Sequence, residues 1–207
     1  MLSCSLKKEK KTNFKGVNFV KRIIFVSILL LMITLIFSSC TSEKLTIYEK
    51  IHSLYYDMPS YKANAEISSF TKEDKITYVS EQTYDKLKDK YTLTTNDLKM
   101  EVTKDETIIT KGISTLKTLS VDDDMHMFVN TFFKSYYETE DVSVTVSKQD
   151  GEKFVLLETD IINPTKTTHH MKLWVDRKTV KPYKMQIFNQ DSFMHTEILF
   201  KSFDIIK

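Results

Sequence analysis

The sequence predicts a mainly β fold of the α+β class: one large curved antiparallel sheet, an open half-barrel of about ten or eleven strands with two helices. Three observations support this prediction. From Tyr61 onward, apolar and polar residues alternate in short runs, as expected for strands with one buried face. Short polar turns separate these runs, which is typical of a meander. Two further segments repeat with the 3.6-residue period of a helix.

The first helical segment directly precedes the alternating region. Its apolar residues fall at i, i+4, i+7, i+8 and i+11, and Pro59 closes the segment. They are Ile47, Ile51, Leu54, Tyr55 and Met58. This stripe requires a partner surface, and the sheet can provide one.

The strands then follow in order. We expect them at 61–68, 76–84, 91–93, 98–102, 108–109, 113–119, 142–147, 154–161, 168–176, 183–189 and 193–203. Asn96-Asp97, Lys111-Gly112 and Gln149-Asp150-Gly151 are turn sequences between neighbouring strands. The sequence contains no repeat period and no low-complexity linker.

The second helix interrupts the strands after the acidic run Asp122 to Asp124. Its predicted stripe is Met125, Phe128, Val129, Phe132 and Tyr136. The acids suit the start of a helix, where side-chain oxygens accept backbone N–H groups and complement the helix dipole. A calcium loop would need further oxygen ligands and a turn glycine, and Met125-His126-Met127-Phe128 supplies neither.

The beginning of the chain is typical of an export signal. Seven bases and one acid precede and flank an apolar run, residues 23–37, and Ser38, Ser39 and Cys40 follow it. Small residues before a cysteine indicate a lipoprotein, so we expect a signal peptide at 1–39, a lipidated tether at 40–44 with lipid on Cys40, and a folded domain at 45–207.

Two alternatives remain for this leader. As a retained membrane helix, the run would rise only about 22 Å, short of the ~30 Å hydrocarbon core. An ordinary secretory signal fits Phe37, since lipoprotein signals usually have Leu three residues before the cysteine. A diacylglyceryl group on Cys40 would anchor the exported chain stably to a membrane.

Composition excludes several function classes. The chain carries 30 basic and 28 acidic residues, but from Cys40 onward it carries 23 and 27, a net charge of about −4. A nucleic-acid-binding protein needs a basic surface, so we expect no nucleic-acid partner. Beyond Cys40 the sequence has no cysteine for a disulfide, a metal or a nucleophile.

Catalytic motifs are also missing. Gly112 and Gly151 are the glycines after Cys40, too few for a phosphate-binding loop or a nucleophile elbow. The histidines are His52, His126, His169, His170 and His195. A metal site from His170 and His195 is the one alternative that the pattern leaves open, and carboxylate pairs for glycan hydrolysis cannot be recognised from sequence. We therefore predict no catalytic, metal or cofactor residues, and no enzyme.

The C-terminal segments resemble a known superfamily. Leu173-Trp174-Val175-Asp176, a basic turn to Pro182, a strand from Tyr183 to Ile187, and a strand ending at Phe203 resemble the last three strands of the LolA/LolB lipoprotein carriers. The resemblance covers residues 45–207 and implies a LolA-like half-barrel. Within it, this Lys-rich and Ile-rich lipoprotein resembles the clostridial germination lipoproteins of the GerS family. That resemblance implies a non-enzymatic spore protein acting with the cell-wall amidase CwlD, an N-acetylmuramoyl-L-alanine amidase, in muramic-δ-lactam formation.

Two functions follow as hypotheses. The first is a membrane-anchored protein that binds and activates a cortex amidase; the second is a half-barrel that holds an acyl chain. A concavity filled by Phe128, Phe132 and Tyr136 would favour the first, and an open apolar trough the second. We also treat the C-terminal strand, 193–203, as an exposed edge strand that could be exchanged between two copies to form a homodimer.

Overall fold

The structure is a computed structural model that describes residues 46–120, 125–139, 142–149 and 152–206. A compact unit spans Ile47–Lys207. The predicted leader, Cys40 and the tether lie outside the described residues, as do Asp122 to Asp124 and the Asp150-Gly151 turn. Within the described part, no helix is long and apolar enough to cross a membrane.

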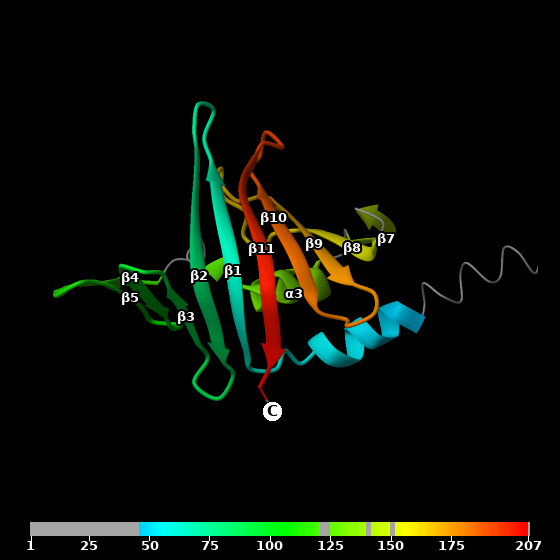
Figure 1. The fold of residues 1–207 in the computed structure, drawn as a ribbon, viewed down its shortest axis with the longest axis horizontal. Coiled ribbons are helices and arrows are strands. Elements are labelled where there is room, and N and C mark those ends of the chain that lie inside the picture. Colours follow the sequence, from blue (N-terminus) through cyan, green and yellow to red (C-terminus); the bar gives the residue numbers. More distant parts are fainter. Residues whose placement is uncertain (1–45, 121–124, 140–141, 150–151, 207) are drawn as a thin grey trace, which may run out of the picture. The chain divides into compact units, whose positions relative to one another are not determined.

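Eleven strands of the described chain form one antiparallel sheet (Figure 1), in the order β6-β5-β4-β3-β2-β1-β11-β10-β9-β8-β7. The strands are β1 Tyr61–Phe70, β2 Lys75–Asp85, β3 Lys90–Thr94, β4 Leu98–Val102, β5 Glu106–Lys111, β6 Ser114–Leu119, β7 Val142–Gln149, β8 Glu152–Asp160, β9 His170–Asp176, β10 Pro182–Phe188 and β11 Met194–Ile205. Together with helix 46–55 and α3, Val129–Glu138, they confirm the predicted fold class.

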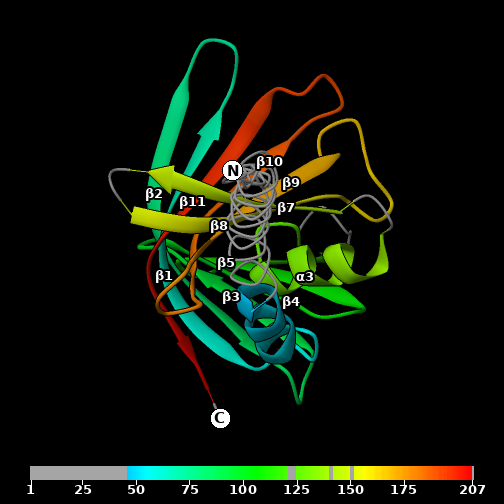
Figure 2. The ribbon, with the colours of Figure 1, turned by 90° about the vertical axis from the view of Figure 1, so that its right-hand side faces the viewer.

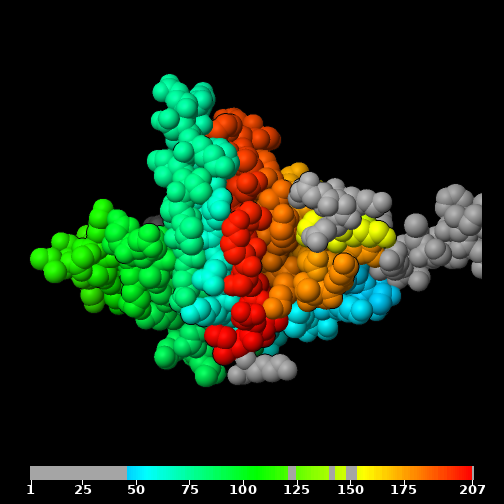
Figure 3. All heavy atoms as spheres, viewed as in Figure 1, coloured from blue at the N-terminus to red at the C-terminus, as the bar shows by residue number. Residues whose placement is uncertain are grey.

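The sheet consists of two meanders that meet at its centre, where the first strand, β1, pairs with the last strand, β11. β1 to β6 run one way from the centre and β11 back to β7 run the other way, and β1 pairs with β11 from Tyr61↔Ile205 to Ser69↔Thr196. A bulge between Asn64 and Ala65 bends this central pair. In the space-filling view the adjoining surfaces of β1 and β11 meet along the middle of the sheet (Figure 3).

The treatment of the C-terminal strand as an edge was wrong. β11 has partners on both sides, β1 and β10, and the two edges are β6 and β7. The reason is non-local: pairing the first and last strands satisfies the backbone groups of both, and neither strand carries a local signal of its distant partner.

The core lies between the concave side of the sheet and the two helices, which are drawn within the curve of the sheet in Figure 2. Helix 46–55 buries Ile47, Ile51 and Tyr55, as its stripe predicts. The Tyr55 ring stacks on Phe133 of α3 with a centroid distance of 4.4 Å. Each such fully buried apolar side chain contributes about 1.5–3 kcal/mol relative to an exposed one.

α3 begins later than predicted. The helix starts at Val129 with Phe128 as its N-cap, and no side chain caps it or places an acid in its first turn. The Tyr61 hydroxyl accepts the Val129 N–H at 3.2 Å instead. His126 to Phe128 form a turn outside α3, and Phe128 is buried there against the sheet.

Candidate binding surfaces

The centre of the concavity is filled by the protein itself. Phe128 and Phe132 are fully buried and Tyr136 is 2% exposed. Their spacing of four residues puts them on one side of the segment, pointing into the curve of the sheet. Phe128 packs on Tyr91 at 5.1 Å and Phe132 stacks on Tyr136 at 5.9 Å between ring centroids. The three side chains named by the sequence therefore act as a plug.

An apolar groove remains beyond the plug, on the side of β2 to β5. Its volume is about 690 Å³, within the usual size range of ligand pockets. Its apolar walls include Tyr78, Leu93, Leu98, Met100, Ile109 and Met127. The register pairs Leu93 with Met100 and Met100 with Ile109, so these side chains share one face of neighbouring strands. The concavity is thus filled at its centre and open at one end.

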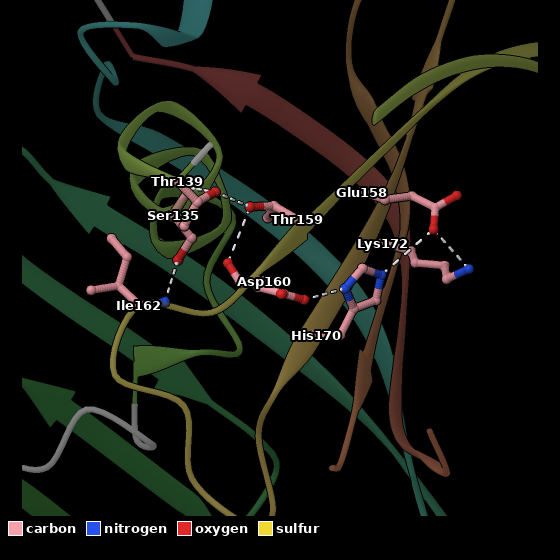
Figure 4. A network of polar contacts seen from close by, with 8 residues as sticks. All are labelled: Ser135, Thr139, Glu158, Thr159, Asp160, Ile162, His170 and Lys172. Carbon is pink, nitrogen blue, oxygen red and sulfur yellow. Dashed lines mark hydrogen bonds and ion pairs between the residues drawn. The ribbon is translucent and has the colours of Figure 1, made fainter. Parts of the chain in front are cut away.

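The convex face of β8 and β9 carries a polar network (Figure 4). His170 Nδ1 lies 2.8 Å from Asp160 Oδ1, and His170 Nε2 lies 3.5 Å from Glu158 Oε2. Lys172 Nζ contacts the same Glu158 oxygen at 2.9 Å. Glu158 pairs with Lys172 and Asp160 with His170 in the strand register, so all four side chains lie on one face.

Charge partners set the protonation of Glu158. Burial acts to raise its pKa, but the hydrogen bonds and charges of Lys172 and His170 outweigh burial and hold the pKa below 4.5. Glu158 is therefore ionised at neutral pH, and the network holds alternating charges on the convex face.

Thr159 links this face to α3. The intervening residue on β8 points inward, where its Oγ1 lies 2.7 Å from Thr139 Oγ1 at the end of the helix. Nearby, Ser135 Oγ accepts the Ile162 N–H at 3.4 Å. As Figure 4 shows, these contacts continue the network from the convex face to Ser135 and Thr139 at the end of α3.

Aromatic side chains and lysines adjoin the network on β9 and β10. Lys184 Nζ lies 4.2 Å from the Trp174 ring centroid, and Lys172 Nζ lies 5.5 Å from the Phe188 centroid. Lys184 and Trp174 are opposite each other in the register. The convex face of this meander combines aromatic rings, lysines and carboxylates.

The histidines do not form a common site. β10 separates the strands of His170 and His195, and His195 Nδ1 is bonded to Thr196 Oγ1 at 2.8 Å. His52 stacks on Tyr56 at 4.7 Å between centroids. Among the described residues, no group of three His, Cys, Asp or Glu side chains is placed to hold a metal ion.

Sequence reasoning did not find the groove or the network. The network could have been recognised from Glu158 and Asp160, two apart on one strand, and His170 and Lys172, two apart on the next, had the pairing register been known. The groove depends on how far the segment before α3 covers the sheet. That coverage is set by packing between distant segments and has no local sequence signal.

The fold is an open antiparallel half-barrel whose concavity holds α3. The chain belongs to the YdcC-like sporulation protein family, whose model matches residues 20–207. Comparison with the curated proteins finds no similar sequence.

Solved structures similar to the chain include a LolA superfamily protein from Nitrosomonas europaea, with 11% identity and a TM-score of 0.42 over 79% of this chain and 94% of that one. Another is the CwlD amidase from Clostridioides difficile in complex with the GerS lipoprotein, with 23% identity and a TM-score of 0.46 over 79% and 96%. A third is a conserved protein from Thermus thermophilus, with 6% identity and a TM-score of 0.47 over 79% and 87%.

Proposed function

We propose that this protein is a non-enzymatic sporulation lipoprotein that is exported, anchored to a membrane through lipid on Cys40, and binds and activates a cortex-modifying N-acetylmuramoyl-L-alanine amidase. In this proposal residues 1–39 are the signal peptide, 40–44 the lipidated tether and 45–207 the binding domain. Membership of a sporulation family supports the cellular process. The partner class is taken from the Clostridioides difficile complex, in which the GerS lipoprotein accompanies the CwlD amidase.

The plug is the observation that most favours a protein partner. A carrier of acyl chains needs its concavity empty, whereas Phe128, Phe132 and Tyr136 are buried there against the sheet. A protein partner would then bind the outside of the sheet. The convex face of β8 to β10 carries Lys184, which lies over the largely buried Trp174 ring, and the Glu158 network, and these charged groups are the contacts that it offers.

The proposal is tested by purifying the full chain in detergent with the CwlD-type amidase of the same organism. We expect the two proteins to co-elute on size exclusion as one species. A Lys184→Glu variant, which reverses a charge on the convex face, should weaken the complex, and a Lys111→Glu variant at the far end of the sheet serves as the matched control. Separate elution of the two wild-type proteins would count against the proposal.

The lipid anchor has its own test. Cys40→Ala should leave a chain that no longer partitions into the detergent phase of a Triton X-114 extraction, because the variant lacks the thiol that accepts the lipid. A Cys4→Ala variant is the matched control and should partition like the wild type. Unchanged partitioning of Cys40→Ala would remove lipidation from the proposal.

A homodimer formed by strand exchange remains part of the proposal. Because β11 is central, its exchange would break the pairings with both β1 and β10 and remake them in the second copy. Light scattering of the full chain over a hundredfold concentration range measures this directly. A constant monomer mass, after correction for detergent, would rule the dimer out.

The groove supports acyl-chain binding as the second candidate function. Its walls at Leu93, Leu98, Met100 and Ile109 are apolar and open to the outside. Solvent extraction of the Cys40→Ala variant, followed by mass spectrometry, would detect a non-covalent lipid without interference from the anchor. Loss of that lipid in Met100→Glu, but not in Ile76→Glu on the exposed part of β2, would favour this function.

A further inference from the structure

A second cavity, distinct from the groove, lies where helix 46–55, the β2–β3 turn and α3 meet. Its volume is about 540 Å³, and three segments far apart in sequence supply its walls. The end of helix 46–55 and the β2–β3 turn both lie at the lower edge of the sheet in Figure 1. Neither function proposed above uses this cavity.

Six of the residues in its walls are aromatic. They are Tyr55, Tyr56, Tyr84, Tyr91, Phe133 and Tyr137. Tyr84 lies 5.0 Å from Tyr91 on one side, and Tyr56 lies 5.3 Å from Tyr137 in an edge-to-face arrangement on another. Tyr55 and Phe133 cover one face of each other at 4.4 Å. A cation in the cavity would be attracted to the ring faces that remain open, since each face carries a negative quadrupole.

The polar groups in the walls are mostly acceptors. Asp57, Asp89 and Glu138 contribute carboxylates to the walls and Lys134 contributes a cation. Lys86 Nζ pairs with Asp57 Oδ1 at 2.5 Å, so Asp89 and Glu138 are the carboxylates without a lysine partner among the described ion pairs. Asn130 is more than nine-tenths buried; its Nδ2 donates to the Tyr91 hydroxyl at 2.6 Å, and its carboxamide oxygen Oδ1 has no partner among the described residues. A buried acceptor without a donor is costly, so a hydrogen-bond donor from a ligand would satisfy it.

Burial and the Asp89 carboxylate act together on two tyrosines in the walls. Burial raises the pKa of Tyr84 to about 12, and the charge of Asp89 and the hydrogen bond that the Tyr84 hydroxyl donates to it at 3.3 Å add to this effect. Burial followed by the charge of Asp89 also raises the pKa of Tyr91. Burial disfavours a charge of either sign in the cavity, and the Asp89 carboxylate makes an anion less favourable there than a cation.

We infer that this cavity binds an organic cation, a primary ammonium or guanidinium group that donates to Asn130 Oδ1 and the Asp89 carboxylate while its charge lies against the tyrosine rings. An anion would meet the carboxylates, and a neutral apolar ligand would leave Asn130 Oδ1 unsatisfied. The inference is independent of the amidase proposal, because it rests only on the walls of the cavity.

The experiment uses the full chain in detergent and saturation-transfer NMR with matched pairs of small probes. Glucosamine is compared with neutral N-acetylglucosamine, and the methylamides of N-acetyl-lysine and N-acetyl-arginine with that of N-acetyl-norleucine. We expect at least one cation to bind about tenfold more tightly than its neutral counterpart. The pair of probes that shows this difference in affinity tells whether the natural ligand is an amino sugar or a basic side chain.

The site is assigned with Asp89→Asn. Asp89 has a φ of 44°, a left-handed conformation that asparagine also adopts readily, so the substitution removes the charge and keeps the turn. Asp97→Asn, in the β3–β4 turn outside this cavity, is the matched control. We expect cation affinity to fall about tenfold in Asp89→Asn and to stay unchanged in Asp97→Asn.

Three results would overturn the inference. They are no binding of any cation, equal binding of cations and neutral counterparts, and equal affinities of Asp89→Asn and Asp97→Asn. A Tyr84→Leu variant, which removes a ring face and leaves every carboxylate in place, gives an independent measurement and should also weaken cation binding.

Discussion

The two meanders of the sheet share one topology but differ in how they are supported. In β9 four of seven residues are buried, whereas all six residues of β6 are exposed. The difference follows from α3: a helix of ten residues is about 15 Å long, while strands are spaced about 4.8 Å apart, so it covers only part of an eleven-stranded sheet. Both meanders bury residues in one core near α3, whereas the outer strands of the first meander extend beyond it and leave a groove.

One sheet can therefore present two kinds of surface, a convex face and an inner groove. Over β8 to β10 the inner face is filled, so only the convex face is available to a partner. Over β2 to β5 the inner face is buried near α3, and part of it lines the groove. The proposed amidase contact and the alternative acyl-chain site therefore fall on different meanders, and variants can separate them.

The largest effect is expected at the plug. Phe132→Ala should lower the free energy of unfolding by about 3–5 kcal/mol, because it leaves a cavity in the closed core. Leu116→Ala on β6, where the side chain is 61% exposed, should change it by no more than about 0.5 kcal/mol. Urea unfolding followed by circular dichroism measures both. Equal effects would show that the meanders do not differ as described.

A smaller effect is expected from overfilling the two meanders. Leu173→Phe, at a fully buried position of β9, should cost about 1–3 kcal/mol since the core has no room. Leu98→Phe, at the groove, should stay within about 0.5 kcal/mol because the added atoms enter open space. If Leu98→Phe proved the more destabilising, the groove would have to be narrower than the structure shows.

Much of the fold was predictable from the chain itself. Alternation and turn residues identify each strand because the sheet buries one face and leaves the other in water. The stripe from Ile47 to Tyr55 predicts helix 46–55 for the same reason. Phe128, Phe132 and Tyr136 were recognised as candidates for the plug from their spacing.

The remaining features depend on distant contacts. The β1–β11 pairing joins segments more than a hundred residues apart, so nothing local marks β11 as central. Met125 and Phe128 continue the apolar spacing of α3, although the helix begins only at Val129. The His170 network and the tyrosine-lined cavity need the register and the packing of three separate segments, which composition and periodicity do not specify.

The smallest predicted effect is on the pH dependence of stability, and it is measured at one glutamate in each meander. Lys90 and Lys99 lower the pKa of Glu101, and Lys172 and His170, acting against burial, lower that of Glu158. Each folded pKa lies below the unfolded value, so each glutamate stabilises the fold above about pH 4.5, and this contribution is lost as the pH falls through the folded pKa.

Glu101→Gln and Glu158→Gln should therefore each reduce stability at pH 7 by about 0.3–1 kcal/mol and approach the wild type at low pH. Melting temperatures across pH 3 to 7 measure this effect, with Glu73→Gln in the β1–β2 turn as the control. Variants that lose equal stability at every pH would show that hydrogen bonding, not charge, holds these pairs.

The central claim is that the chain activates an amidase. The direct measurement is the rate at which the CwlD-type amidase of the same organism releases peptides from spore cortex peptidoglycan, with and without the full chain in detergent. The account predicts a faster rate with the wild-type chain, no rate from the chain alone, and a weaker effect of Lys184→Glu than of Lys111→Glu. An amidase rate unchanged by a saturating amount of the chain would contradict it.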